Sequence, residues 1–98
     1  MKAFTVTLTS ANTNYNLRDL VRAIDSAIDD SAKQIDVSAD KANTADVLIG
    51  DASLSATRYG NKLIATDSIT IRHRGLVHLS NLTARSATAL QKVSITLW

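Results

Sequence analysis

The chain has 98 residues, of which 45% are hydrophobic and 20% charged, and this composition is typical of a single globular domain (residues 1–98) rather than a disordered chain. It contains no cysteine, which excludes disulfides, thiolate catalysis and cysteine zinc sites. The net charge is only +2 and the basic residues form no long run, so the charge pattern gives no support to nucleic acid as a partner without excluding it. No segment approaches the roughly 20 apolar residues of a transmembrane helix, so we expect no membrane partner.

The first 30 residues (1–30) are predicted to form one strand and one helix. Apolar residues alternate with threonines over residues 3–8, and this period of two is typical of a half-buried strand. Asn16 stands directly before a helical pattern, and asparagine is a preferred residue at a helix N-terminus. Apolar residues follow at helical spacing, namely Leu17, Leu20, Val21, Ile24 and Ile28. The sequence therefore predicts a helix over residues 17–28 that docks on a sheet.

The charges of this predicted helix oppose its dipole. Arg18 and Arg22 lie toward its N-terminal half. Asp25, Asp29 and Asp30 lie toward its C-terminal end, where negative charge is unfavourable. These side chains are either solvated or paired with a neighbouring subunit, and in the second case they belong to an interface.

Residues 34–98 are predicted to form the strands of a sandwich. Short apolar segments alternate with small polar turns, at Ile35 and Val37, Val47 to Ile49, Leu54, Leu63 and Ile64, Ile69 and Ile71, Val77 and Leu79, and Val93 to Leu97. Gly50 is expected to supply a bulge or bend, Tyr59 to Asn61 a hairpin-type turn, and Gly75 the end of a strand. About seven or eight strands and one helix predict a mainly β fold, an antiparallel β-sandwich of the jelly-roll type with one packed α-helix near the N-terminus.

Residues that could perform chemistry are few. No acid, base and nucleophile occur at a usable spacing, and no glycine-rich loop could hold a phosphate group, so we expect neither an enzyme nor a bound cofactor. His73 and His78 are five residues apart, a spacing that sends strand side chains to opposite faces and argues against a shared metal ion.

One basic cluster and two aromatic residues are further candidates for contacts with a partner. Arg72, His73 and Arg74 form the densest basic cluster, next to Gly75, and this cluster is either a contact for an anionic surface or a solvated turn. Tyr59 and Trp98 are aromatic residues of the kinds that are enriched in interfaces, with the core as an equal alternative for Trp98. The chain contains no proline to protect edge strands, so we also expect self-association.

A little over half of the chain resembles a small β-sandwich module that is common among structural proteins of tailed bacteriophages. In that module an Asn-Thr turn leads into a Val-x-Ile-Gly strand, a Ser/Thr-rich segment with Gly before Leu, a Leu-x-x-Leu strand and a last strand that ends in Trp. The matching residues here are Asn43 and Thr44, Val47, Ile49 and Gly50, Gly60 and Leu63, Leu79 and Leu82, and Trp98. The N-terminal strand and helix lie outside the resemblance.

The resemblance implies a non-enzymatic structural protein of the virion, which assembles in the host cytoplasm. The leading hypothesis is a capsid decoration or cement protein that binds the major capsid protein or other virion proteins as a homo-oligomer, with a trimer favoured. The alternatives are a tail, neck or head-fibre component and, from a different class, a carbohydrate-binding or nucleic-acid-binding β-sandwich that uses Arg72, His73 and Arg74.

Overall fold

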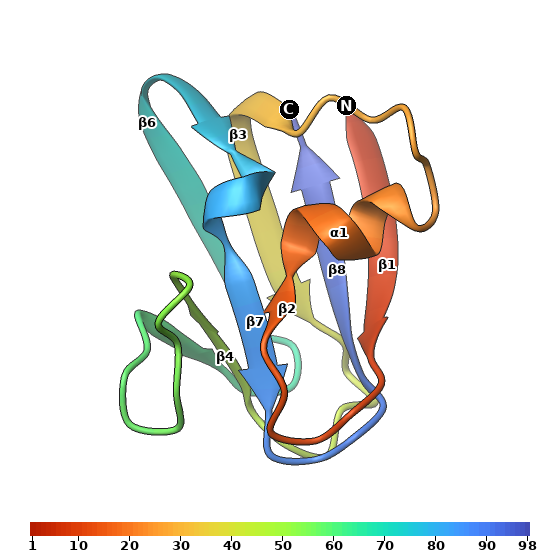
Figure 1. The fold of residues 1–98 in the computed structure, drawn as a ribbon, viewed down its shortest axis with the longest axis vertical. Helices are drawn as coiled ribbons and strands as arrows, with labels where there is room; N and C mark the ends of the chain where they lie inside the picture. Colours follow the sequence, from red (N-terminus) through yellow and green to blue (C-terminus); the bar gives the residue numbers. More distant parts are fainter.

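The protein folds into two antiparallel sheets and one short α-helix (Figure 1). The structure is a computed structural model and describes all 98 residues. The elements are β1 (Lys2–Leu8), β2 (Tyr15–Asn16), α1 (Leu17–Arg22), β3 (Ser31–Ala39), β4 (Val47–Gly50), β5 (Asn61–Leu63), β6 (Ser68–His78), the 3₁₀ helix η1 (Leu79–Asn81), β7 (Thr83–Ser86) and β8 (Gln91–Leu97). The mainly β class that the alternating pattern predicts is therefore confirmed.

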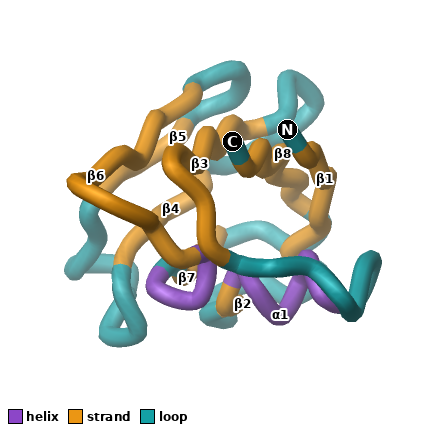
Figure 2. Tube along the Cα trace, turned by 90° about the horizontal axis from the view of Figure 1, so that it is seen from above, coloured by secondary structure: helices purple, strands orange, loops and turns teal.

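The strands are distributed over two four-stranded sheets that face each other (Figure 2). The strand order is β1-β8-β3-β6 in the first sheet and β2-β7-β4-β5 in the second, and every pair is antiparallel. In the first sheet Lys2 lies opposite Leu97, so the two ends of the chain lie side by side at one end of the molecule (Figure 1). None of the helices combines the length and apolar character that crossing a membrane requires.

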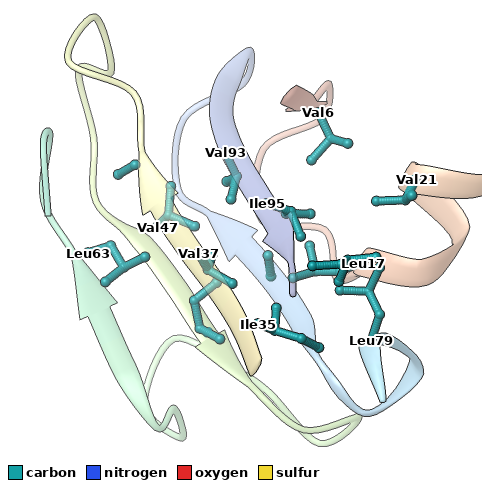
Figure 3. Packing of buried hydrophobic residues seen from close by; sticks show 14 of the residues in the cluster. Val6, Leu17, Val21, Ile35, Val37, Val47, Leu63, Leu79, Val93 and Ile95 are labelled. Carbon is teal, nitrogen blue, oxygen red and sulfur yellow. The ribbon is translucent and has the colours of Figure 1, made fainter. Parts of the chain in front are cut away.

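The core is one apolar cluster between the two sheets (Figure 3). Its 17 buried residues come from both sheets, from α1 and η1, and from the segment before β3. On β8, for example, Val93 and Ile95 are fully buried, whereas Ser94 and Thr96 lie on the outer face. Because aromatic residues are scarce, Val, Ile, Leu and Ala fill this core, as the composition indicates.

The helix α1 begins where the sequence predicts and ends six residues early. Asn16 is the N-cap, and its Oδ1 accepts a hydrogen bond from the N–H of Arg18 at 3.0 Å. The helix ends at Arg22, not at residue 28, so Ile24 is 59% exposed and does not reach the core. The physical reason lies in Asp25, whose carboxylate accepts the N–H two residues further on and so offers the backbone a turn in place of another helical bond.

The predicted reversal of charge along the helix is wrong for the same reason except at Arg18, which lies in the first turn. Asp19 lies in the first turn and Arg22 in the last, an arrangement that the helix dipole favours. Asp25 and Asp29 lie beyond the helix, where each carboxylate accepts hydrogen bonds from residues just after it. Asp29 bonds both the N–H and the hydroxyl of Ser31, so β3 begins there, three residues before the predicted start.

Two predicted features of the second half of the chain also differ from the structure. Residues 51–60 form one long loop between β4 and β5, so the segment from Tyr59 to Asn61 is not a tight hairpin turn. Leu54 is buried in this loop rather than in a strand, and it covers Gly50 so closely that a Cβ atom there would lie 3.1 Å from its Cδ1. A loop residue can be as buried as a strand residue, so hydrophobicity alone does not tell whether an apolar residue lies in a loop or on a strand.

The strand β6 does not end at Gly75 but continues to His78. Gly75 has a φ of +79°, a left-handed conformation that glycine adopts readily, and this allows the strand to bend and resume. Leu79 then lies in η1, fully buried, and not on a strand.

The amide of Asn16 has a second role that leads to a testable prediction. Its Nδ2 donates to the carbonyl of Ser80 at 2.8 Å, so one side chain caps α1 and ties it to η1. We expect Asn16→Ala to lower the free energy of unfolding by about 1–2 kcal/mol. Asn16→Asp keeps the cap acceptor but loses the donor, so chemical denaturation should place it between the wild type and the alanine variant. An alanine variant as stable as the wild type would contradict this role.

Candidate functional site on and beside the edge strand β6

The strand β6 is an edge of the first sheet and pairs only with β3. Its register with β3 shifts once, since Arg72 lies opposite Gln34 whereas Val77 lies opposite Ala32. Residues 73–76 therefore leave the ladder, and we call them the β6 bulge; Figure 1 shows the bend at the upper end of β6. The predicted basic cluster thus lies inside a long strand, not at a strand end.

A pocket of about 300 Å³ lies beside the β6 bulge. Its apolar lining comes from Ile71, Leu76, Val77 and Leu82, and its polar lining includes Arg72. Both His73 and His78 line this pocket as well. The bulge between the two histidines breaks the regular alternation on which their predicted opposite orientation rests. No group of three His, Cys, Asp or Glu side chains lies close enough to hold a metal ion.

The side chain of Trp98 lies on the outer face of the same sheet and is held by Asp36. Its indole N–H donates to Asp36 Oδ2 at 2.7 Å. Asp36 Oδ1 accepts from the Thr70 hydroxyl at 2.9 Å and from the Gln34 amide at 3.0 Å. These bonds hold the pKa of Asp36 below its ordinary value of 3.8, and the bond from the Trp98 indole has the largest effect. Trp98 is 53% exposed, so the structure places it on the surface and not in the core.

A shallow depression of about 530 Å³ lies next to Trp98. Its lining residues are Trp98, Gln34, Lys33 and Arg72. Arg72 therefore borders both this depression and the pocket beside the β6 bulge. We call the depression and the pocket together the β6 site, since they share Arg72 and lie along one strand.

Lys33 and Arg72 of the β6 site, and Arg74 of the adjacent β6 bulge, have no carboxylate within ion-pair distance. The structure contains two ion pairs, Arg18 with Asp19 at 3.6 Å and Lys62 with Asp46 at 3.8 Å, and neither involves Lys33, Arg72 or Arg74. Exposed positive charges without partners attract anionic groups, and at this edge they are next to apolar surface. The site can thus bind a ligand that is anionic and partly apolar.

The remaining predicted interface residues lie elsewhere. Arg18 and Arg22 belong to α1, and Asp25 and Asp29 to the segment that follows it (Figure 1). Tyr59 is in the loop between β4 and β5 and borders a separate hollow of about 250 Å³. Of the nine predicted residues, the structure brings Arg72, His73, Arg74 and Trp98 together at or next to the β6 site. Sequence reasoning missed Lys33, Gln34 and Asp36, whose only signal was the alternation that places Gln34 and Asp36 outside while Ile35 faces the core.

The bonds to Asp36 lead to a prediction about pH. Because the pKa of Asp36 in the folded protein is below the value in the unfolded chain, these bonds stabilise the folded state fully above the unfolded pKa. Their contribution is lost as the pH falls through the folded-state pKa. We therefore expect wild type to be more stable than Asp36→Asn near neutral pH, and this difference to shrink on acidification below 3.8. Urea denaturation followed by the fluorescence of Trp98, the single tryptophan, measures both; a difference that grows on acidification would contradict the prediction.

Comparisons of the chain with protein-family models, with curated proteins and with solved structures found no match.

Proposed function

We propose that the two antiparallel sheets have the topology of a jelly roll. The strand pairs β1–β8, β2–β7, β3–β6 and β4–β5 nest inside one another along the chain, and successive pairs alternate between the two sheets. One long antiparallel ribbon that is wrapped over itself has this order, and jelly rolls consist of eight strands in two sheets. Viral capsid and lectin domains are among the proteins that use this architecture.

On this basis we propose that the protein is a non-enzymatic structural protein of a tailed bacteriophage particle. Its most specific role is that of a capsid decoration or cement protein that binds the major capsid protein. The nested strand order is the observation that carries this proposal, since it joins the resemblance in the turn and strand residues to an architecture common in capsids. The unpaired basic residues of the β6 site supply a surface for binding without turnover.

The test is to add the purified protein to phage particles that lack it. A decoration protein should rebind these particles and raise the temperature at which they release DNA. Quantitative mass spectrometry of purified virions then gives the copy number, which separates a decoration protein with many copies from a tail, neck or head-fibre component with few. Absence of the protein from virions and failure to rebind them would together refute the virion role.

We also propose that the protein assembles as a homo-oligomer, a trimer in the favoured form. The sheets leave β1, β2, β5 and β6 as edges, and open edges are the usual sites of strand addition. Analytical ultracentrifugation of the purified protein over a range of concentrations measures the assembly; a monomer at every concentration would contradict it.

A carbohydrate-binding function is a second candidate, favoured by one specific observation. Trp98 is exposed yet held in place by Asp36, and Lys33, Gln34 and Arg72 surround the adjacent depression. A fixed aromatic ring beside polar and basic groups suits an anionic sugar. Titration with heparin oligosaccharides and with neutral oligosaccharides, followed by the fluorescence of Trp98, tests this function. The matched variants are Trp98→Ala and Tyr59→Ala, followed by calorimetry, and equal binding by both would contradict a role for Trp98.

A further inference from the structure

We propose that the pocket beside the β6 bulge, together with the free edge of β6 over residues 68–72, binds an extended acidic segment of a partner protein as an added strand. One large apolar side chain of that segment would occupy the pocket, and its carboxylates would face Arg72 and Arg74. This inference deepens the proposed function by naming the contact, and it rests on that function only for the identity of the partner.

The first argument comes from the backbone of β6. Residues 68–72 pair with β3 on one side, and no strand pairs with them on the other. An edge strand directs every second N–H and C=O group away from its sheet, where these groups can bond an incoming strand. Main-chain bonds of this kind supply the affinity when a peptide adds to a sheet, while pockets for its side chains supply specificity. The β6 edge has both the free main-chain groups and an adjacent pocket.

The second argument comes from the pocket itself. Ile71, Val77 and Leu82 are partly buried and pack against the core, so they form a fixed apolar floor. Leu76, in the β6 bulge, is 55% exposed and also lines the pocket. A volume of about 300 Å³ admits one large apolar side chain but not a helix. Seating that side chain would remove the exposed part of Leu76 from water, which is favourable.

The third argument is charge, which decides between a different protein and a second copy. Neither Arg72 nor Arg74 has a carboxylate within ion-pair distance. If two copies paired their β6 strands antiparallel over the free edge, about Thr70, Arg72 of each copy would lie opposite Ser68 of the other and would gain no carboxylate. A second copy therefore leaves the two arginines without acidic partners. An acidic segment supplies these partners and is therefore the occupant that the edge favours.

The electrostatic surroundings restrict where the acidic groups can lie. Asp29 and Asp30 lie close enough to His78 to interact with it electrostatically. The far end of β6 thus has negative neighbours, whereas Arg72 and Arg74 have none within ion-pair distance. The carboxylates of the segment should therefore face the centre of β6 rather than its end at His78.

The test uses a synthetic capped peptide in which Glu alternates with Val around one central Leu. Its binding is followed by calorimetry and by amide chemical shifts of the labelled full chain. We expect shifts at residues 68–77 and at Leu82, with slowed hydrogen exchange of the outward amides of residues 68–72. A peptide with Lys in place of Glu should not bind. No binding of the acidic peptide, or shifts confined to α1 or Trp98, would overturn the proposal.

Two sets of variants separate strand addition from simple charge attraction. Arg72→Gln combined with Arg74→Gln should weaken binding at least about tenfold, whereas Arg22→Gln combined with Lys92→Gln, which removes two exposed charges elsewhere, should leave it unchanged. Two further peptides carry methylated backbone nitrogens, one at the odd-numbered and the other at the even-numbered residues. In one of them the methyl groups replace the N–H groups that face β6, so this peptide cannot complete the main-chain bonds and should not bind. If both methylated peptides bind as well as the parent, attraction is purely electrostatic and strand addition is refuted.

The peptide experiment and the virion-rebinding experiment can fail independently of each other. If the protein binds the acidic peptide but does not rebind virions, the proposed β6 contact stands and the proposal that its partner is a virion protein is refuted. Rebinding of virions by the Arg72→Gln, Arg74→Gln protein with unchanged affinity would retain the virion role and refute the β6 contact. Circular dichroism of each variant shows that it is folded before either result is used.

Discussion

Replacement of Ile35 by alanine is expected to lower the free energy of unfolding by about 2–5 kcal/mol. Ile35 lies on β3, the strand between β8 and β6, and its side chain is 0% exposed. It is opposite Ile71 on one side and Leu97 on the other, so a cavity at this position touches three strands of the sheet. A domain of this size has a total stability of about 5–15 kcal/mol, and the loss is therefore a large part of it.

The matched control for this prediction is Ile64→Ala. Ile64 is 52% exposed and lies just beyond β5, so the same change of side chain should cost no more than about 0.5 kcal/mol. Urea denaturation followed by circular dichroism measures both values under identical conditions. Equal losses for the two variants would show that Ile35 does not occupy the core as described.

Replacement of Gln91 by methionine should be the next most damaging change, at about 1–3 kcal/mol. Gln91 is buried at the start of β8, and its Oε1 accepts the N–H groups of Thr44 and Ala45 at 2.8 and 3.0 Å. Its Nε2 donates to Thr44 Oγ1 and to the carbonyl of Ala89. Methionine has a similar length but no strong donor or acceptor, so it would leave these groups without partners.

The position beside Gln91 provides the control. The side chain of Lys92 points to solvent, so Lys92→Met should change stability by less than about 0.5 kcal/mol. Hydrogen exchange adds a local measurement, because the amides of Thr44 and Ala45 should exchange faster in Gln91→Met alone. Unchanged exchange at both amides would contradict the role assigned to the Gln91 side chain.

Much of the fold could be predicted because a strand with one buried face has a period of two in its sequence. The alternation on β1, β3 and β8 predicts correctly which residues face the core, as with Val6, Val37 and Ile95. The helix end could not be predicted from the apolar stripe, because the turn at Asp25 competes with the helix after Arg22. Gly75 does not show from the sequence whether the strand ends or bends there, since glycine permits both.

The candidate site was predictable in part. Arg72 and Trp98 are conspicuous in the sequence, one in a basic cluster and the other as the single tryptophan. Their proximity depends on β3 lying between β8 and β6, which is a property of the strand order and has no local signal. Asp36 was missed because a lone carboxylate on a strand has no recognisable motif until its partners on β6 and after β8 are known.

The position of the chain ends has a mechanical consequence. Lys2 lies opposite Leu97 in an antiparallel pair, so both ends leave the sheet at the same place. A force that pulled the ends apart would act along the hydrogen bonds between β1 and β8 and would open them one after another, as a zipper opens. Such a pair yields at low force, whereas strands that are sheared past each other must break many bonds at once. A protein that resists tension with this fold must therefore take up the load through its sheet edges and faces, and not through its two ends.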